Sequence, residues 1–150
     1  MWDRFIRFLA RHFRVGDRPT VPIGLTEEQF AGLSAAVRAA VSHWSQDVRV
    51  HGSRASGTAR ADSDLDIAVL VTTDRFNEIL IERFGLPNPG SAKERTMQRA
   101  RETGKIQSGE AGLRAVRREV EAVLGMEVDL SVIRINGPFD RGPYVPLRPT

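Results

Sequence analysis

Three short segments of the chain alternate hydrophobic and polar residues, which is the pattern of β-strands. The strands are expected over residues 47–51, 64–71 and 127–134. The second segment contains an unbroken apolar run from Ile67 to Val71, which indicates a strand covered on both faces. In the third segment Asp129 lies on the face opposite Val128 and Leu130.

Other segments repeat their apolar residues with the 3.6-residue period of a helix. Thr26 and Gln29 have the spacing of a capping box, so a helix should begin there and bury a stripe of residues from Phe30 to Trp44. Further helices are expected over residues 74–84, 91–103 and 108–124. The helix at 91–103 has few apolar residues beyond Met97, so we expect it to be weakly anchored.

The two ends of the chain differ from this middle part. Residues 2–14 form an amphipathic pattern that could dock on the domain, lie on a membrane surface or bind nucleic acid. We therefore divide the chain into an arm and linker (1–20), one domain (21–136) and a Pro/Gly-rich tail (137–150) that is expected to be irregular. Strands and helices in one domain of this size predict an α+β fold.

Composition narrows the chemistry. With no cysteine, the 150-residue chain has no disulfide, thiolate metal site or cysteine nucleophile, and three histidines need carboxylates to complete a zinc site. No apolar run approaches the roughly 18 residues of a membrane span. We expect a soluble, cytoplasmic protein without stable membrane insertion, with secretion as part of a toxin system left open.

The net charge of +3 is unevenly distributed. Residues 1–20 carry +3, residues 91–118 carry +5, and the remaining residues carry −5. A basic segment between acidic ones is compatible with a phosphate-bearing partner or with an ordinary solvated surface.

Three acids carry the candidate chemistry. Asp64 and Asp66 alternate along the second strand, which would place both on one face about 7 Å apart. Neighbouring carboxylates raise each other's pKa, and a shared cation relieves this, with oxygen ligands favouring Mg²⁺ or Mn²⁺. Asp129 supplies a third carboxylate on another hydrophobic strand. Three acids could hold two metal ions about 3.5–4 Å apart.

The turn Gly52-Ser53 is the candidate phosphate site, because glycine lets backbone N–H groups approach a phosphate closely. Ser63 could either cap its turn or contact phosphate, and Arg54 flanks the same loop. Lys105 and Arg118 have no oppositely charged partner at helical spacing, so they are candidates for NTP phosphates or an RNA backbone.

These motifs resemble the DNA-polymerase-β-like nucleotidyltransferase superfamily, in particular its minimal bacterial members. The resemblance rests on His51-Gly52-Ser53, a ten-residue loop, Asp64-Leu65-Asp66-Ile67, and later Val128-Asp129-Leu130. It implies a small mixed sheet flanked by helices, an NTP donor and two Mg²⁺ ions. It also implies that Asp64 and Asp66 are metal ligands and that Asp129 is a ligand and the base toward the acceptor. His51 stands where the family has a hydrophobic residue, and the insert before Asp129 is longer than a minimal enzyme needs.

The expected reaction is transfer of a nucleoside monophosphate from an NTP to a hydroxyl, with release of pyrophosphate. The acceptor could be an RNA 3′ end, especially of tRNA, a protein hydroxyl, or a small molecule such as an antibiotic. Residues 96–110 and 137–140 are also similar to nucleotidyltransferase domains of bacterial polymorphic toxins, which implies a cognate antitoxin or immunity protein. A non-catalytic nucleotide- or RNA-binding module is the alternative of a different class.

Overall fold

The computed structural model describes residues 20–149. The predicted amphipathic helix at residues 2–14 and most of the linker that follows it lie outside the described residues.

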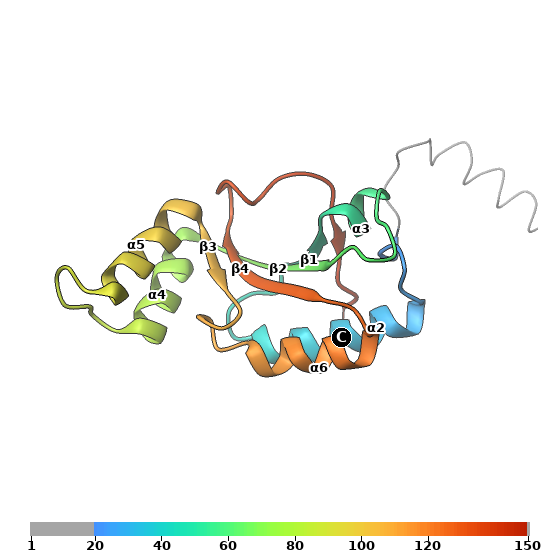
Figure 1. Cartoon of the computed structure of the whole chain (residues 1–150), viewed down its shortest axis with the longest axis horizontal. Helices are drawn as coiled ribbons and strands as arrows, with labels where there is room; N and C mark the ends of the chain where they lie inside the picture. Colours follow the sequence, from blue (N-terminus) through green and yellow to red (C-terminus); the bar gives the residue numbers. More distant parts are fainter. Residues whose placement is uncertain (1–19, 150) are drawn as a thin grey trace, which may run out of the picture.

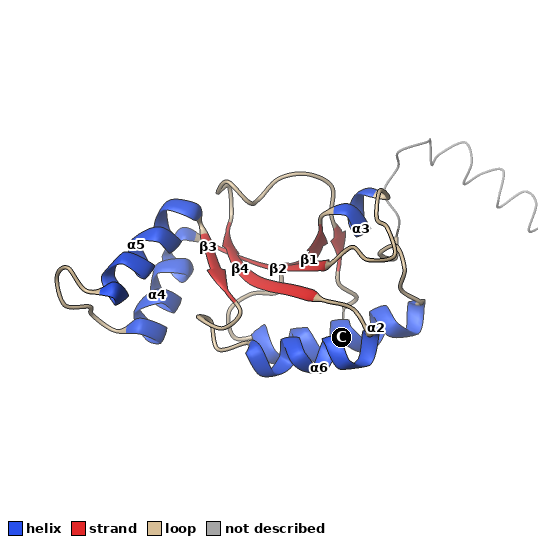
Figure 2. Cartoon of the chain, in the orientation of Figure 1, coloured by secondary structure: helices blue, strands red, loops and turns tan. Residues whose placement is uncertain are grey.

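A five-stranded sheet with the strand order β3-β4-β2-β1-β5 forms the centre of the domain (Figure 2). The strands are β1 (Val48–His51), β2 (Leu65–Val71), β3 (Lys105–Gln107), β4 (Val128–Arg134) and β5 (Val145–Pro146). The central pair, β2 and β4, is parallel, and the other pairs are antiparallel. The predicted α+β fold with a small mixed sheet is therefore confirmed.

The longer helices lie on one face and at one end of this sheet, while the short α3 (Ser53–Ser56) follows β1 near the opposite end (Figure 1). The longer helices are α2 (Glu27–Val41), α4 (Thr73–Phe84), α5 (Ala92–Thr103) and α6 (Arg114–Leu124). α2 and α6 pack side by side beneath the sheet, while α4 and α5 form a pair at its β3 end.

Local sequence signals explain where these helices begin. The capping box of Thr26 and Gln29 is confirmed, with the Thr26 hydroxyl accepting from the Gln29 amide at 3.0 Å and the Gln29 side chain accepting from the Thr26 amide at 2.9 Å. The helix α5 forms as predicted, and burial of Met97 and Ala100 anchors it. It is therefore better anchored than the sequence indicated.

The two faces of the sheet have different surroundings. Alternate residues of β2, including Leu65, Ile67 and Val69, face the main hydrophobic core. The opposite face has a small apolar cluster of Ala68, Leu70 and Ile133 and is bridged by residues 135–144, which arch over it on the side away from α2 and α6 (Figure 1). This second face is where polar side chains can gather.

Three sequence-based expectations were wrong. The helix expected from residue 108 begins at Arg114, because Gly112 adopts a left-handed φ of 75° that interrupts a helix, and strand β3 precedes this turn. The loop expected from residue 54 begins with the short helix α3. The tail expected to be irregular pairs with β1 through β5 and buries Leu147.

Among residues 20–149, no helix combines the length and the apolar character needed to cross a membrane.

Candidate active site

A pocket of about 300 Å³ lies on the second face of the sheet, where β2 and β4 begin. Asp66 and Asp129 are register neighbours on these parallel strands, so two residues 63 positions apart in sequence face the same pocket. The pocket is lined by His51, Gly52, Asp66, Ile67, Ala68, Lys105, Asp129, Ser131, Ile133, Phe139 and Arg141. The fold thus brings two of the three predicted acids together.

Asp66 is the most electrostatically stressed of these acids. Burial raises the pKa of its carboxyl above the ordinary value, and the negative charges of Asp129 and Asp64 raise it further, while Lys105 opposes the shift. An acid in these surroundings gains from any cation that enters the pocket.

Lys105 provides part of that positive charge within the protein. Its Nζ donates to Oδ2 of Asp129 at 3.0 Å, and only 17% of its side chain is exposed. The ammonium also lies 4.9 Å from the centre of the Phe139 ring. The structure therefore places the predicted phosphate-binding Lys105 in the pocket, directly beside an acid.

Asp64 occupies a different position from the one predicted. Strand β2 begins at Leu65, so Asp64 precedes it and is exposed. Asp64 lines a neighbouring hollow together with Asp129, and its charge contributes to the raised pKa of Asp66. Asp129 lines both hollows, which connects all three acids. Within residues 20–149, however, no three Asp, Glu, His or Cys side chains converge closely enough to hold one ion.

Gly52 closes the other side of the pocket. It has a φ of 75° and a Cβ at this position would collide with Oδ2 of Asp66. Both the conformation and the close approach require glycine. Ser53, the next residue, is the first of helix α3, so the predicted Gly52-Ser53 turn lies immediately beside the acids.

Arg54 requires a correction, because the structure assigns it a structural role. Its side chain is buried and donates to the backbone carbonyls of Ile23 and Ser63 at 2.6 Å each, and to that of Ala61 at 3.4 Å. The guanidinium holds the loop instead of facing the pocket, so it is not placed to bind a phosphate.

The other two predicted phosphate contacts also lie away from the pocket lining. The Ser63 hydroxyl accepts from the Arg60 amide at 2.9 Å, which is the turn-capping role that the sequence left open. Arg118 is exposed on α6, one of the two helices that cover the opposite face of the sheet. Arg118 is therefore not placed to bind a phosphate in this pocket.

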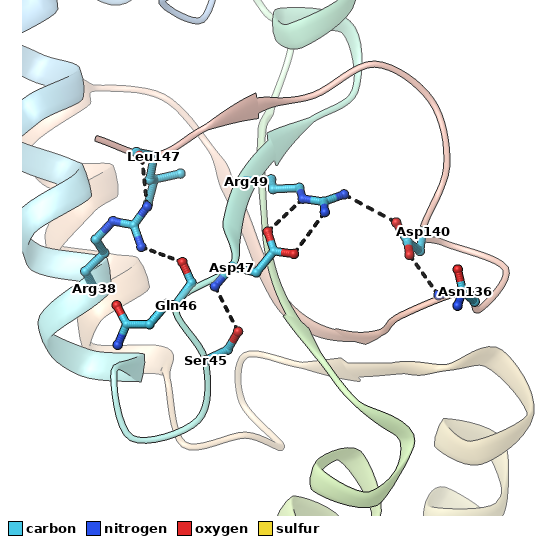
Figure 3. Close-up of polar contacts among 8 residues, drawn as sticks. All are labelled: Arg38, Ser45, Gln46, Asp47, Arg49, Asn136, Asp140 and Leu147. Carbon is cyan, nitrogen blue, oxygen red and sulfur yellow. Dashed lines mark hydrogen bonds and ion pairs between the residues drawn. The ribbon is translucent and has the colours of Figure 1, made fainter. Parts of the chain in front are cut away.

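The segment that covers the pocket, residues 135–144, was not predicted to do so from the sequence; part of it is shown in Figure 3. Arg49 binds Asp47 through two hydrogen bonds of 2.8 and 2.9 Å, lies 3.5 Å from Asp140 and stacks over Tyr144 at 4.0 Å. The second Asp140 oxygen accepts from the Asn136 amide at 2.8 Å. Arg49 points away from the core side of its strand, which was the available signal, but Asp140 and Tyr144 lie more than 90 residues away in sequence.

His51 forms the β1 wall of the pocket. Its Nε2 is buried without a hydrogen-bond partner within the described residues, and its ring lies 6.2 Å from that of Tyr144. Burial lowers the pKa of the imidazole, as does the charge of Arg49, against smaller opposing effects of Asp140 and Asp47. His51 is consequently neutral around pH 7.

Comparison with known proteins gives one match. A family model described as a nucleotidyltransferase domain matches residues 33–145, a range that includes the three acids, Gly52 and Lys105. No curated protein and no solved structure gives a significant match.

Proposed function

The chain belongs to the nucleotidyltransferase domain family, and we propose that this transferase moves a nucleoside monophosphate from an NTP to a hydroxyl acceptor with release of pyrophosphate. The observation that carries this proposal is the pairing of Asp66 with Asp129 on adjacent parallel strands, beside the tight turn at Gly52. Carboxylates next to a backbone turn that can approach phosphates fit phosphoryl chemistry.

Members of this family generally use divalent metal ions. Asp66, Asp129 and Asp64 offer only oxygen donors, and the raised pKa of Asp66 favours a cation, so these residues fit Mg²⁺, with Mn²⁺ as a substitute. We infer that they hold two ions, which requires the three carboxylates to converge more closely than they do in the structure. When bound, such ions neutralise the triphosphate and the departing pyrophosphate.

The remaining roles follow from the positions of the side chains. The backbone at Gly52 and Ser53 would orient the triphosphate, and Lys105, which lies in the same pocket, would contact its oxygens. Asp129 would accept the proton of the acceptor hydroxyl. The hydroxyl oxygen then bonds to the α-phosphorus, the bond from this phosphorus to the α–β bridging oxygen breaks, and pyrophosphate leaves with the electron pair.

The acceptor classes expected from the sequence were an RNA 3′ end such as that of tRNA, a protein hydroxyl and a small molecule of the antibiotic type. If transfer to tRNA inactivates it, the protein would act as a toxin in the cytoplasm, with an antitoxin or immunity protein as its partner. A non-catalytic binding module is less well supported, because Asp66 and Asp129 are both present and face one pocket.

Replacing Asp129 tests the division of roles. Asp129→Asn should reduce transfer by at least about 100-fold, since even residues that only support metal ligands cost 10–100-fold when they are changed. NTP binding, measured by calorimetry with Mg²⁺ present, should be largely retained because Asp66, Asp64 and the Gly52 turn remain. Asp74→Asn, an exposed acid at the start of α4, is the matched control. Equal loss of binding and transfer would contradict the role of Asp129 toward the acceptor.

A further inference from the structure

The arrangement of the strands indicates from which side an acceptor reaches the acids. Gly52 follows β1, and the strand order from there is β1, β2, β4 and β3, with α5 beyond β3. If the NTP occupies the Gly52 side, as in the proposed function on which this inference rests, the acceptor must approach Asp129 from β3 and α5.

A groove runs along that side. A second hollow shares Lys105 and Phe139 with the acid pocket and extends to Thr96, Arg99 and Thr103. A third hollow shares Thr96 and Arg99 with the second one and extends to Arg95. We define the α5 groove by Arg95, Thr96, Arg99, Thr103 and Phe139. Because neighbouring hollows share lining residues, they form a row from α5 to Asp66 and Asp129.

The groove combines the basic Arg95, Arg99 and Lys105 with the acidic Glu102 and Glu110, so its basic side chains exceed its acidic ones by one. The guanidinium of Arg99 has no hydrogen-bond or ion-pair partner among residues 20–149, and α5 carries four basic and two acidic residues. Phe139 is 45% exposed at the junction with the acid pocket, where a base could stack on its ring.

The threonines favour RNA over DNA. Each hydroxyl donates to a helix carbonyl, Thr96 to Ala92 at 3.1 Å and Thr103 to Arg99 at 2.9 Å. Both threonines line the groove, and a hydroxyl oxygen that donates its own proton keeps the capacity to accept, which matches a ribose 2′-hydroxyl as donor.

We propose that the α5 groove binds the 3′ end of a single-stranded RNA and delivers its terminal hydroxyl to Asp129. Arg99 and Arg95 contact phosphates of the strand, and Phe139 stacks on a base near the end. The nucleotide is then added to the 3′-hydroxyl with the bond changes described above.

Binding of a fluorescent single-stranded RNA to the full chain, followed by anisotropy over a range of salt concentrations, tests this groove without requiring catalysis. Arg99→Gln should weaken binding and lower the slope of log affinity against log salt by about 0.7, the value for one lost phosphate contact. Lys93→Gln removes the same charge from the same helix at an exposed position that lines neither hollow, and should leave the slope unchanged. Phe139→Ala should weaken binding by about tenfold.

The possible outcomes distinguish RNA binding by the α5 groove from the nucleotidyl transfer reaction. Three results would overturn the proposal that the α5 groove binds an RNA acceptor. They are equal effects of Arg99→Gln and Lys93→Gln, absence of RNA binding at low salt, and labelling of proteins instead of RNA by an α-labelled NTP. Groove-dependent RNA binding without transfer to the 3′ end, for any of the four NTPs, would overturn delivery of the 3′-hydroxyl to Asp129, while transfer of label to another acceptor would leave the proposed function standing.

Discussion

At the residue scale, the surroundings of Asp66 connect stability with function. The carboxyl is buried near two other acids, and only Lys105 offsets this among the groups that shift its pKa. The identity of this acid was predictable from sequence because alternation along a strand fixes its face. Its strained environment was not, since it depends on Asp129 arriving from a strand 63 residues later.

This environment predicts that Asp66→Asn stabilises the metal-free protein. The pKa of Asp66 is higher in the folded than in the unfolded protein, so the protonated acid stabilises the fold. This contribution to the free energy of unfolding is complete below the ordinary pKa of 3.8 and is lost as pH rises through the folded-state pKa. At pH 7 we expect the thermal midpoint of Asp66→Asn to lie about 2–4 °C above that of the wild type, the size of a ~1 kcal/mol gain in a chain of this length. Asp62→Asn, at an exposed site, should not change it. A lower midpoint for Asp66→Asn would refute this account of the acid.

Gly52 is the second residue whose surroundings give a prediction. Gly52→Ala places a methyl group against Asp66 in a left-handed conformation, so unfolding should become easier by about 1–3 kcal/mol in chemical denaturation. Gly57→Ala has a similar φ of 87° but nothing within 4 Å of the added carbon, so it isolates the backbone cost. If the two variants are equally stable, contact with Asp66 is not what requires glycine at position 52.

At the scale of elements, long hydrophobic segments were predictable and short ones were not. Strands β2 and β4 have seven residues each and a clear apolar pattern. Strand β3 has three residues and β5 has two, and both exist because a strand beside them, β4 and β1 respectively, offers unpaired backbone groups. Such tertiary pairing is hardly encoded in the local sequence, which is why the strand that carries Lys105 was not predicted.

Residues 135–144, which cover the pocket, are held through the two contacts of Asp140 with Arg49 and with the Asn136 amide. Asp140→Ala removes the partner of Arg49 and the acceptor of the Asn136 amide, and should destabilise the fold by about 1–3 kcal/mol. Hydrogen exchange should rise in residues 135–144 while β4 stays protected. Glu78→Ala breaks an exposed ion pair and should cost no more than about 1 kcal/mol. Unchanged exchange in this segment would show that it is held by other contacts.

At the scale of the whole molecule, the pocket is a product of strand order. Its walls come from β1, β2, β4 and β3 and from the segment 135–144, so residues from 51 to 141 meet in one place. Sequence motifs identified the acids, the Gly52 turn and Lys105, because each of these has a local or family signature. They could not identify Phe139, Arg141 or Ser131 as pocket residues, and they assigned Arg54 to phosphate although its guanidinium holds backbone carbonyls within the loop.

The most direct test of the central claim uses each α-labelled NTP with Mg²⁺ and a cell extract, and compares the wild-type chain with Asp66→Asn. We predict that the wild type transfers label from at least one NTP to an acceptor and releases unlabelled pyrophosphate. Asp66→Asn, although folded, should lose at least about 100-fold of this activity. Equal labelling by both proteins, or no labelling by the wild type with any NTP, would contradict the claim that these paired acids form a nucleotidyltransferase active site.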